Sequence, residues 1–569
     1  MSRKAKTLTH VGAWRLHLVR FVFISLILGL GWRLADIQVI HPDFLRNQGD
    51  ARHIRHVPIA AHRGMILDRH GEPLAISTPV HSVWFNPETL KASDAELKQL
   101  AKLLNIKPSS IKKKIAANKK REFVYLKRRV TPELSKKVTN LNITGVALQD
   151  EYKRYYPASE VTSHLVGFNN VDDHGQEGLE LTFDSALKGV TGLKRMFRDK
   201  NGNFVAGGEQ LKASKSGQNV KLSVDLRLQY LAYQSLKSTV DKYHARSGTA
   251  VILDVHTAEV LAMVNQPSFN PNNRRDLKLS DLRNSAVIDV FEPGSTVKPF
   301  TVASGLKSGK FKLDSQIDTR PGTLKVSGHT IKDHRDYGVI NVSTLIQKSS
   351  NVGASKIALE LEPETLWQDF SAFGMAEPTG SYFPGEVMGH MPDLRTWRKL
   401  DRATLAYGYG LNTTALQLAR AYTILANGGV ARPVSFQKLD EAPLGRRVFS
   451  KDVMKNVLTM MEGVATPQGT ARLAAVENYT VAGKTGTVKK AKRGGYAEKR
   501  YLSLFAGVIP ASNPRLAMVV MIDDPQGDKY YGGLIAAPVF SEVMTGAMRL
   551  LNIAPDNREL KSPMLVAQK

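Results

Sequence analysis

The sequence contains no cysteine, and this absence excludes several kinds of chemistry at once. A chain without cysteine has no disulfide framework, no thiol nucleophile and no cysteine-ligated zinc site. Histidine offers no clear alternative, because His329 and His334 lie five residues apart without a third metal ligand in the pattern. We therefore expect no metal and no cofactor, and the composition is compatible with an oxidising compartment.

Aromatic and acidic residues are also scarce. Aromatic residues make up 7% of the chain, and 52 acidic residues face 79 basic ones, which gives a formal charge of +27. Such a charge suits nucleic acid, a membrane surface or an anionic polymer as a partner. The sequence shows neither zinc-finger spacing nor the aromatic and basic pattern of RNA-binding domains. Nucleic acid is therefore not expected.

Long hydrophobic runs are absent except for one near the N-terminus. Residues 21–32 are interrupted only by Ser25 and two glycines, and extension to residues 16–40 gives a span longer than the about 20 residues that cross a bilayer. The flank before it is basic, which predicts a cytoplasmic N-terminus. We expect an uncleaved single-pass anchor; a cleaved signal peptide and a buried core helix are the alternatives.

The rest of the chain has the composition of globular domains. With 569 residues, 42% hydrophobic and 23% charged, it is too long for one core. Residues 63–71 resemble a strand that meets a turn. Several glycine-centred turns in residues 160–215, together with Lys215-Ser216-Gly217-Gln218, indicate a domain boundary. Residues 107–129 carry ten basic side chains and one acid. They form either a solvated helix face with a loop or a contact for anionic glycan or lipid head groups.

Beyond residue 218 the pattern predicts an α+β arrangement. Residues 249–255 and 260–264 form a hairpin signal around a short turn. The other predicted strands are residues 220–224, 479–482, 502–509 and 516–522. The predicted helices are residues 226–240, 345–359, 415–425 and 538–551. A sheet of early and late strands, with helices between and against it, is expected.

One short stretch suggests a nucleophile with its own base. Pro293 and Gly294 break the chain, and a helix is predicted to start there, with Ser295 in its first turn and Lys298 three residues on. A serine hydroxyl beside an amine, at the positive end of a helix dipole, suits nucleophilic catalysis. The pattern alone is weak. Four other pairs have the same spacing: Ser109/Lys112, Ser110/Lys113, Ser185/Lys188 and Ser304/Lys307.

Two later elements single out Ser295. Ser349-Ser350-Asn351 begins 54 residues after it, in a helical segment, and Lys484-Thr485-Gly486-Thr487 begins 135 residues later still, on a predicted strand. Only this ordered set runs from a helix start through a helical loop to a late strand. Taken singly, each residue is better explained as a surface or capping residue.

The chemistry gives each member of the set a role. Lys298 must be partly neutral to take the Ser295 proton, so burial and a nearby cation such as Lys484 must lower its pKa. Ser349 can relay a proton to a leaving amine, and Asn351 can hold a substrate amide or Lys298 itself.

The last motif suits a peptide substrate. Lys484 and Thr485 suit a substrate carboxylate, and Gly486 leaves room for substrate backbone along the strand edge. The backbone N–H groups of Ser295 and Thr487 would form an oxyanion hole.

This ordered set resembles the penicillin-binding protein and serine β-lactamase superfamily, although Ser350 replaces the aspartate of the Ser-Asp-Asn motif. Further stretches are similar to class B penicillin-binding proteins, and most of all to the division-specific type. They are residues 63–69, 151–157, 178–180, 407–411, 414–419 and 482–487. Tyr409, within one of them, is a candidate to stack on substrate, although ordinary packing explains it equally well.

The resemblance implies an α+β fold in three parts. These are a single transmembrane helix, an elongated mixed pedestal (dimerisation-like) domain, and a penicillin-binding/serine β-lactamase-like transpeptidase domain with a five-stranded antiparallel sheet and helices. The expected ranges are a cytoplasmic tail at 1–15, an anchor at 16–40, a pedestal at 41–217, a transpeptidase domain at 218–555 and a C-terminal tail at 556–569.

The implied function is a peptidoglycan D,D-transpeptidase that cross-links stem peptides of the septal wall through an acyl-enzyme on Ser295. Implied partners are stem peptides and their lipid-linked precursor, β-lactam inhibitors, a glycan polymerase of the FtsW type and other membrane proteins of the division machinery. The implied location is the inner membrane at the septum, with the bulk of the chain in the periplasm.

Other functions remain open from the residues alone. A β-lactamase or a D,D-carboxypeptidase would form the same acyl-enzyme but would let water attack it. An elongation-specific class B transpeptidase would share every motif. A penicillin sensor or a mainly scaffolding role would need less turnover, although residues 1–15 are short for a signalling domain.

Overall fold

The computed structural model describes residues 12–40, 43, 54–198, 204–492 and 495–557. Contacts divide the chain into two compact units. One contains residues 1–61, 79–152 and 190–215, and the other contains residues 62–78, 153–189 and 216–569. The domain ranges expected from the sequence stay a prediction.

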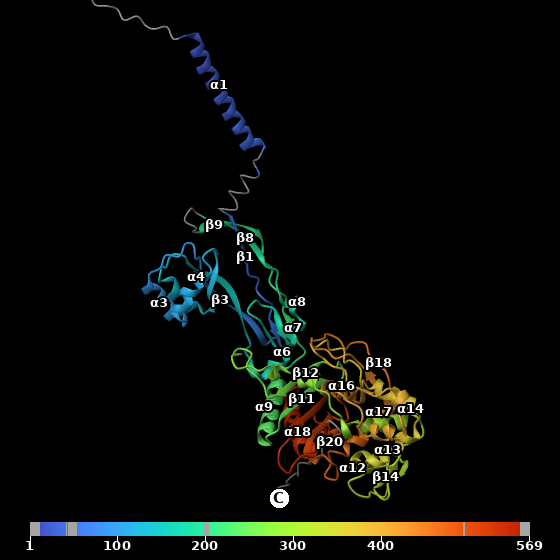
Figure 1. The fold of residues 1–569 in the computed structure, drawn as a ribbon. Helices are drawn as coiled ribbons and strands as arrows, with labels where there is room; N and C mark the ends of the chain where they lie inside the picture. The colour runs from blue at the N-terminus through green and yellow to red at the C-terminus, as the bar shows by residue number, and fades with distance from the viewer. Residues whose placement is uncertain (1–11, 41–42, 44–53, 199–203, 493–494, 558–569) are drawn as a thin grey trace, which may run out of the picture. The chain divides into compact units, whose positions relative to one another are not determined.

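The N-terminal helix α1 (Ala13–Ala35) continues into the π-helical η1 (Asp36–Ile40) (Figure 1). Together they form one helix of 28 residues that is long and apolar enough to cross a membrane. None of its side chains is buried in the protein. Large apolar side chains that nothing in the protein covers fit a lipid environment, as the sequence predicted.

The first unit contains a small sheet and a helical layer. Strands β1 (Ile54–Ile59), β8 (Gly192–Arg198) and β9 (Phe204–Lys212) pair antiparallel. Helices α3 (Asp94–Leu104), α4 (Pro108–Ala117) and α5 (Pro132–Thr139) accompany β4 (Val124–Val130). Their shared apolar core includes Leu100, Leu104 and Leu126. The basic run 107–129 therefore covers a helix, the loop after it and most of a strand. The predicted helix and loop are present and the strand was not predicted; the alternative of a contact for anionic glycan or lipid head groups stays a prediction.

Two longer strands, β3 (Pro73–Phe85) and β5 (Val146–Tyr155), pair with each other. β3 also pairs with β4 and with the two-residue β2 (Ile66–Leu67), which pairs in turn with β10 (Val220–Lys221). The strand expected at residues 220–224 is thus only two residues long. The strand and turn predicted at residues 63–71 are present.

Three stretches that resembled class B proteins meet in the second unit. Arg63 Nη2 donates to Glu180 Oε2 at 2.6 Å, and Arg154 Nε donates to Glu180 Oε1 at 2.6 Å. Asp184 accepts from Arg63 Nη1 at 2.7 Å. Arg63, Arg154 and Glu180 are all buried. Because an unpaired charge is costly in an apolar interior, each member of this network depends on the others.

The second unit is built on a five-stranded antiparallel sheet, which confirms the α+β prediction. Its order is β12-β11-β21-β20-β19. The strands are β11 (Ser247–Asp254), β12 (Val260–Gln266), β19 (Ala482–Lys492), β20 (Gly495–Ile509) and β21 (Leu516–Asp523). Hairpin β11–β12 and the late strands β20 and β21 lie where the sequence predicted them. β19 is an edge strand, so one side of its backbone is not paired within the sheet.

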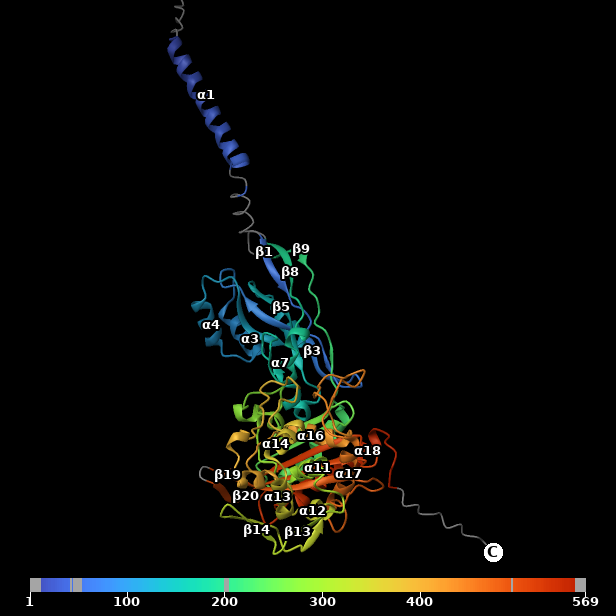
Figure 2. The ribbon, with the colours of Figure 1, turned by 90° about the vertical axis from the view of Figure 1, so that its right-hand side faces the viewer.

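Helices cover both faces of this sheet. α9 (Leu226–Lys242) and α18 (Gly532–Leu550) pack together on one face (Figure 1). α16 (Ala415–Ala426) packs on the other, together with α11 (Lys298–Lys307) and α17 (Lys451–Glu462) (Figure 2). The strands are therefore apolar on both sides; every residue of β12 and β21 is buried. α9 and α16 confirm the helices predicted at 226–240 and 415–425.

Three further predicted elements differ from the structure. The helix at 345–359 is two helices, α12 (Val342–Lys348) and α13 (Asn351–Glu360), because Ser349 has a left-handed φ of 61° that ends the first one. The helix expected to start at Pro538 starts at Gly532. Proline there removes one hydrogen bond, which the burial of Ile535 and its neighbours offsets.

The third difference is a strand that begins later than expected. The sequence predicted a strand from residue 479, but β19 begins at Ala482. Thr480 is held instead by the carboxylate of Asp556, which accepts from its N–H at 2.8 Å and from its hydroxyl. A side chain that is distant in sequence thus replaces the ladder bonds that strand pairing would have given.

Candidate active site

Ser295 lies in a tight turn that leads directly into a helix. The turn is the 3₁₀ helix η4 (Gly294–Val297), and α11 follows at Lys298. Two hydrogen bonds at Thr296 fix the turn. The Thr296 hydroxyl donates to the Pro293 carbonyl at 2.7 Å, and the Thr296 carbonyl accepts from Tyr422 Oη at 2.8 Å. The predicted helix start is thus correct, and Ser295 is held by a rigid backbone.

Glycine is required beside this turn. Gly408 has a φ of +85°, and its carbonyl accepts from the Gly294 N–H at 3.1 Å. A Cβ on residue 408 would lie 2.1 Å from the Gly294 carbonyl oxygen. Only glycine allows so close an approach of two backbones. Gly408 belongs to one of the stretches that resembled class B proteins, but its structural role was not predicted from the sequence.

Lys298 is the centre of the hydrogen-bond network. Its Nζ lies 3.0 Å from Ser295 Oγ, 3.0 Å from Ser349 Oγ, 2.6 Å from the Ser349 carbonyl oxygen and 2.8 Å from Asn351 Oδ1. Asn351 Nδ2 donates to the Lys332 carbonyl at 2.9 Å, which explains why its oxygen faces the amine. Three residues from two separate motifs thus surround one buried amine.

Lys484 completes the network from β19. Its Nζ donates to Ser349 Oγ at 3.0 Å, so this hydroxyl lies between two lysine amines. Both lysines have no exposed surface. Of the five Ser-x-x-Lys pairs, Ser295/Lys298 is the one that the structure brings to the other two motifs; Lys307, for comparison, pairs with Asp369.

Burial changes the protonation of both lysines. It lowers the pKa of Lys484 to about 7. It lowers the pKa of Lys298 well below that of a free lysine, and the positive charge of Lys484 lowers it further, while the Asp333 carboxylate acts in the opposite direction. Neutral lysine is therefore accessible at physiological pH, which is the electrostatic condition that a lysine base needs.

The remaining residues of the last motif lie on β19. Thr485 Oγ1 is 3.0 Å from Thr470 Oγ1, and Thr487 Oγ1 accepts from the Gly532 N–H at 3.1 Å. A Cβ on Gly486 would lie 3.1 Å from both Leu504 and Thr296 side-chain atoms. The need for glycine at position 486 thus has a cause within the protein, beyond the room for substrate that the sequence suggested.

Tyr409 lies beside β19 in an aromatic cluster. Its ring centroid is 5.5 Å from that of Tyr407 and 5.6 Å from that of Tyr496. Burial, and then the nearby Glu292 carboxylate, raise the pKa of Tyr409, while a hydrogen bond with the Lys489 backbone lowers it. Tyr409 is thus near the strand of the Lys-Thr-Gly motif, and in the described part of the chain it makes no hydrogen bond to Ser295 or Lys298.

Two features of the site were not foreseen. Asp333 accepts hydrogen bonds from Ser350 and from the start of α13, and Thr470 contacts Thr485. No spacing relative to the three motifs marks either residue. In the described ranges no three His, Asp or Glu side chains converge as metal ligands.

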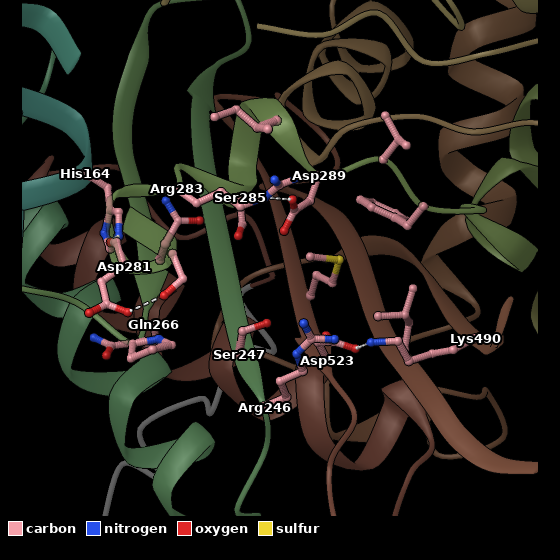
Figure 3. Close-up of a pocket in the computed structure, with 18 residues that line it drawn as sticks. His164, Arg246, Ser247, Gln266, Asp281, Arg283, Ser285, Asp289, Lys490 and Asp523 are labelled. Atoms are coloured by element: carbon pink, nitrogen blue, oxygen red, sulfur yellow. Dashed lines mark hydrogen bonds and ion pairs between the residues drawn. The ribbon is translucent and has the colours of Figure 1, made fainter. Parts of the chain in front are cut away.

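A cavity of about 630 Å³ in the same unit lies outside this constellation (Figure 3). It is lined by residues such as His164, Ser285, Phe291 and Lys490, and by none of the residues that surround Lys298. Ion pairs occur among its lining residues: Arg283 Nε donates to Asp289 Oδ1 at 2.5 Å, and Lys490 pairs with Asp523. Cavity size therefore does not identify the reactive centre in this unit.

Comparisons with known proteins agree with the geometry. Residues 248–545 match the penicillin-binding protein transpeptidase domain, and residues 58–222 match the penicillin-binding protein dimerisation domain. The chain is 42% identical over 551 residues to peptidoglycan D,D-transpeptidase FtsI of Escherichia coli K12, covering 96% of this chain and 93% of that protein. It is 41% identical over 545 residues to the probable peptidoglycan D,D-transpeptidase PbpC of Pseudomonas aeruginosa, covering 96% of each.

Solved structures show the same likeness. The transpeptidase domain of Burkholderia pseudomallei penicillin-binding protein 3 superimposes with a TM-score of 0.55 and 39% identity, over 59% of this chain and 97% of that one. A peptidoglycan synthetase from Bifidobacterium adolescentis gives a TM-score of 0.71 with 25% identity, over 89% of this chain and 98% of that one. With both domain types present and a relative this similar over nearly its whole length, the chain belongs to the class B penicillin-binding proteins.

Proposed function

We propose that this protein is a peptidoglycan D,D-transpeptidase that cross-links stem peptides of the septal wall through an acyl-enzyme on Ser295. The observation that carries the proposal is the position of the buried Lys298 amine, 3.0 Å from the hydroxyls of both Ser295 and Ser349. The names of the relatives in Escherichia coli and Pseudomonas aeruginosa support the same activity.

The hydrogen bonds of Lys298 suit a neutral amine. The Ser349 carbonyl and Asn351 Oδ1 can only accept, so they take two N–H groups. A neutral amine has two N–H groups and one lone pair, which is then left for a serine hydroxyl. In this arrangement Lys298 accepts the Ser295 proton while Ser295 Oγ attacks the carbonyl carbon of the penultimate D-alanine.

The proton then has a route to the leaving group. Ser349 Oγ lies between Lys298 and Lys484, so it can pass the proton to the amine of the departing terminal D-alanine. Collapse of the tetrahedral intermediate breaks the D-alanyl–D-alanine bond and leaves an ester on Ser295. An amine of a neighbouring strand attacks this ester, forms the cross-link and returns the proton to the site.

The edge strand β19 suits the peptide. An extended stem peptide can add to its unpaired side, with its carboxylate near Lys484 and Thr485 and with Gly486 beside its backbone. The N–H groups of Ser295 and Thr487 are the proposed oxyanion hole, and Tyr409 is the proposed aromatic contact for substrate. β-Lactams would acylate Ser295 in the same way.

Transfer to an amine fits this site better than hydrolysis. Among the described residues, Ser295 Oγ has Lys298 as its hydrogen-bond partner, and no carboxylate hydrogen-bonds to it. A β-lactamase or carboxypeptidase needs a deacylating water and a base that activates it. The site therefore favours the transpeptidase over these two alternatives.

Cellular placement is part of the proposal. The N-terminal helix would anchor the chain in the inner membrane with residues 1–15 in the cytoplasm and residues 41–555 in the periplasm. The resemblance to FtsI suggests a septal site, and a glycan polymerase of the FtsW type with other division proteins as partners. The lipid-linked precursor is then the source of the stem peptides.

Depletion of the protein tests the septal role. Cells that lose a septal transpeptidase continue to elongate but do not divide, so we expect filaments, scored by microscopy as cell length after repression of the gene. Round cells would instead indicate the elongation-specific alternative. Expression of wild-type protein should restore normal length.

The pH dependence of acylation tests the roles of the two lysines. Because only neutral Lys298 accepts a proton, the rate of penicillin acylation should rise with pH through the lowered pKa of Lys298. Lys484→Met removes a positive charge that lowers this pKa, so the rising limb should move to higher pH. Stopped-flow rates of penicillin acylation from about pH 5 to about pH 10 would give the position of this limb in both proteins. If the rising limb of the pH profile stays in place in Lys484→Met, Lys484 is not the cation that lowers the pKa of Lys298.

A further inference from the structure

Asp333 contacts the catalytic constellation from outside the three motifs. Its Oδ2 accepts from Ser350 Oγ at 2.6 Å, and its Oδ1 accepts from the N–H groups of Asn351 at 2.5 Å and Val352 at 3.0 Å. The carboxylate thus satisfies two otherwise unpaired amides at the start of α13 and the hydroxyl of its N-cap residue. A negative charge at a helix N-terminus also interacts favourably with the helix dipole.

The segment that carries Asp333 is itself fixed. Asp333 follows directly after β15 (His329–Lys332), which pairs with β14 (Thr323–Val326). Its N–H donates to the Gly322 carbonyl at 2.9 Å. The preceding carbonyl, of Lys332, accepts from Asn351 Nδ2 at 2.9 Å. Two consecutive residues therefore hold both the backbone and the side chain of Asn351.

The hydrogen bonds from residues 332 and 333 to Asn351 matter because Ser349, the residue between α12 and α13, has a strained backbone. Ser349 has a positive φ of 61°, a conformation that serine rarely adopts. It persists only when the surroundings fix it, and Asp333 binds the three residues that follow. In this conformation the Ser349 hydroxyl reaches both lysines and its carbonyl reaches Lys298. The position of the proton relay thus depends on Asp333.

Asp333 also acts on Lys298 through its charge. Burial and the Lys484 cation lower the pKa of Lys298, and the Asp333 carboxylate raises it. Burial raises the pKa of Tyr337, and the Asp333 carboxylate raises it further. Lys484 and Asp333 are the charged groups whose effects reach Lys298, so they set its proton affinity from opposite directions.

We infer that Asp333 is a positioning residue of the acylation site: it holds Ser349 and Asn351 against Lys298 and places a negative charge beside this network. The inference rests on the proposed acylation of Ser295. Asp333 has two effects: its hydrogen bonds fix the position of the loop, and its charge acts on Lys298. Two different substitutions of Asp333 separate these effects.

Asp333→Asn tests the effect of charge. Asparagine has the same size and its oxygen still accepts from the α13 amides, so the loop should keep its position. Loss of the negative charge should lower the pKa of Lys298 and move the rising limb of the penicillin acylation profile to lower pH, by about half a unit to one unit. This direction is opposite to that expected for Lys484→Met, and a simple loss of stability would not produce it.

Asp333→Ala tests the effect of position. It removes the carboxylate that accepts from the Asn351 and Val352 amides, so the plateau rate of acylation should fall about tenfold or more. Asp336→Asn is the matched control, because Asp336 is an exposed carboxylate three residues away whose Oδ1 accepts from the Gly338 N–H. Asp336→Asn should change neither the rising limb nor the plateau of the pH profile of the acylation rate. Thermal melting of each variant in its full-length form would show whether it is folded.

The results separate this inference from the proposed function. If wild-type protein forms no penicilloyl adduct by intact mass, the proposed function fails. If wild type acylates but the limb of Asp333→Asn stays in place or moves to higher pH, the inference about Asp333 is wrong. A limb that moves equally in Asp336→Asn would also overturn it, since a nonspecific change of surface charge would then explain the shift.

Discussion

Ser295→Ala is expected to abolish covalent labelling of the full-length protein by a fluorescent penicillin. Alanine removes the Ser295 hydroxyl, which lies 3.0 Å from Lys298 Nζ in the turn that leads into α11, and without a nucleophile no acyl bond forms. Gel fluorescence and intact mass would measure the label. The fold should be unaffected, because the turn is held by Thr296 and Tyr422 rather than by the Ser295 hydroxyl.

Ser304→Ala provides a matched control in the same helix. Ser304 has a lysine three residues on, as Ser295 does, but its hydroxyl is buried and donates to the Phe300 carbonyl at 3.1 Å. Its lysine, Lys307, pairs with Asp369. This variant should be labelled like wild type. Undiminished labelling of Ser295→Ala would show that another residue is the nucleophile and would end the assignment.

Lys298→Met is expected to slow acylation by about a thousandfold, the range of a lost general base. Methionine has a similar length and no charge, so it suits a position with no exposed surface. Ser295 would remain in place but would lose its proton acceptor, and the Ser349 hydroxyl would lose one of its two amine neighbours. Stopped-flow measurement with penicillin gives the rate.

Lys298→Arg distinguishes a base from a fixed charge. Arginine stays protonated, so it cannot accept the Ser295 proton. If Lys298 acts as a base, both variants should be slow. A rate for Lys298→Met within about tenfold of wild type would contradict the role of general base, since general base catalysis contributes more than that.

The parts of the fold predicted from sequence are those with strong local signals. Hairpin β11–β12 has alternating or continuous apolar runs around a short turn, and α16 begins with Thr414 and Gln417 in a capping box. Long, strongly patterned segments of this kind depend little on distant contacts. The three motifs were predictable because Ser295, Ser349 and Lys484 follow one another along the chain in the order that the resemblance implies.

The elements that were not predicted depend on distant residues. The helix break at Ser349 needs a left-handed serine, which no local signal favours, and it is stabilised by Asp333 from another segment. The late start of β19 follows from Asp556, some 75 residues away in sequence. Gly408 is required because of its positive φ and because a second backbone approaches it. Contacts of this kind are visible only in three dimensions.

The most direct test of the central claim follows the acyl group itself. Full-length protein is incubated with a stem peptide that ends in D-alanyl-D-alanine, with an amine acceptor, and then mapped by peptide mass spectrometry. The account predicts an acyl group on the peptide that contains Ser295 and a product in which the acceptor amine has replaced the terminal D-alanine. An acyl group on another residue, or release of D-alanine by hydrolysis alone with the acceptor present, would contradict it.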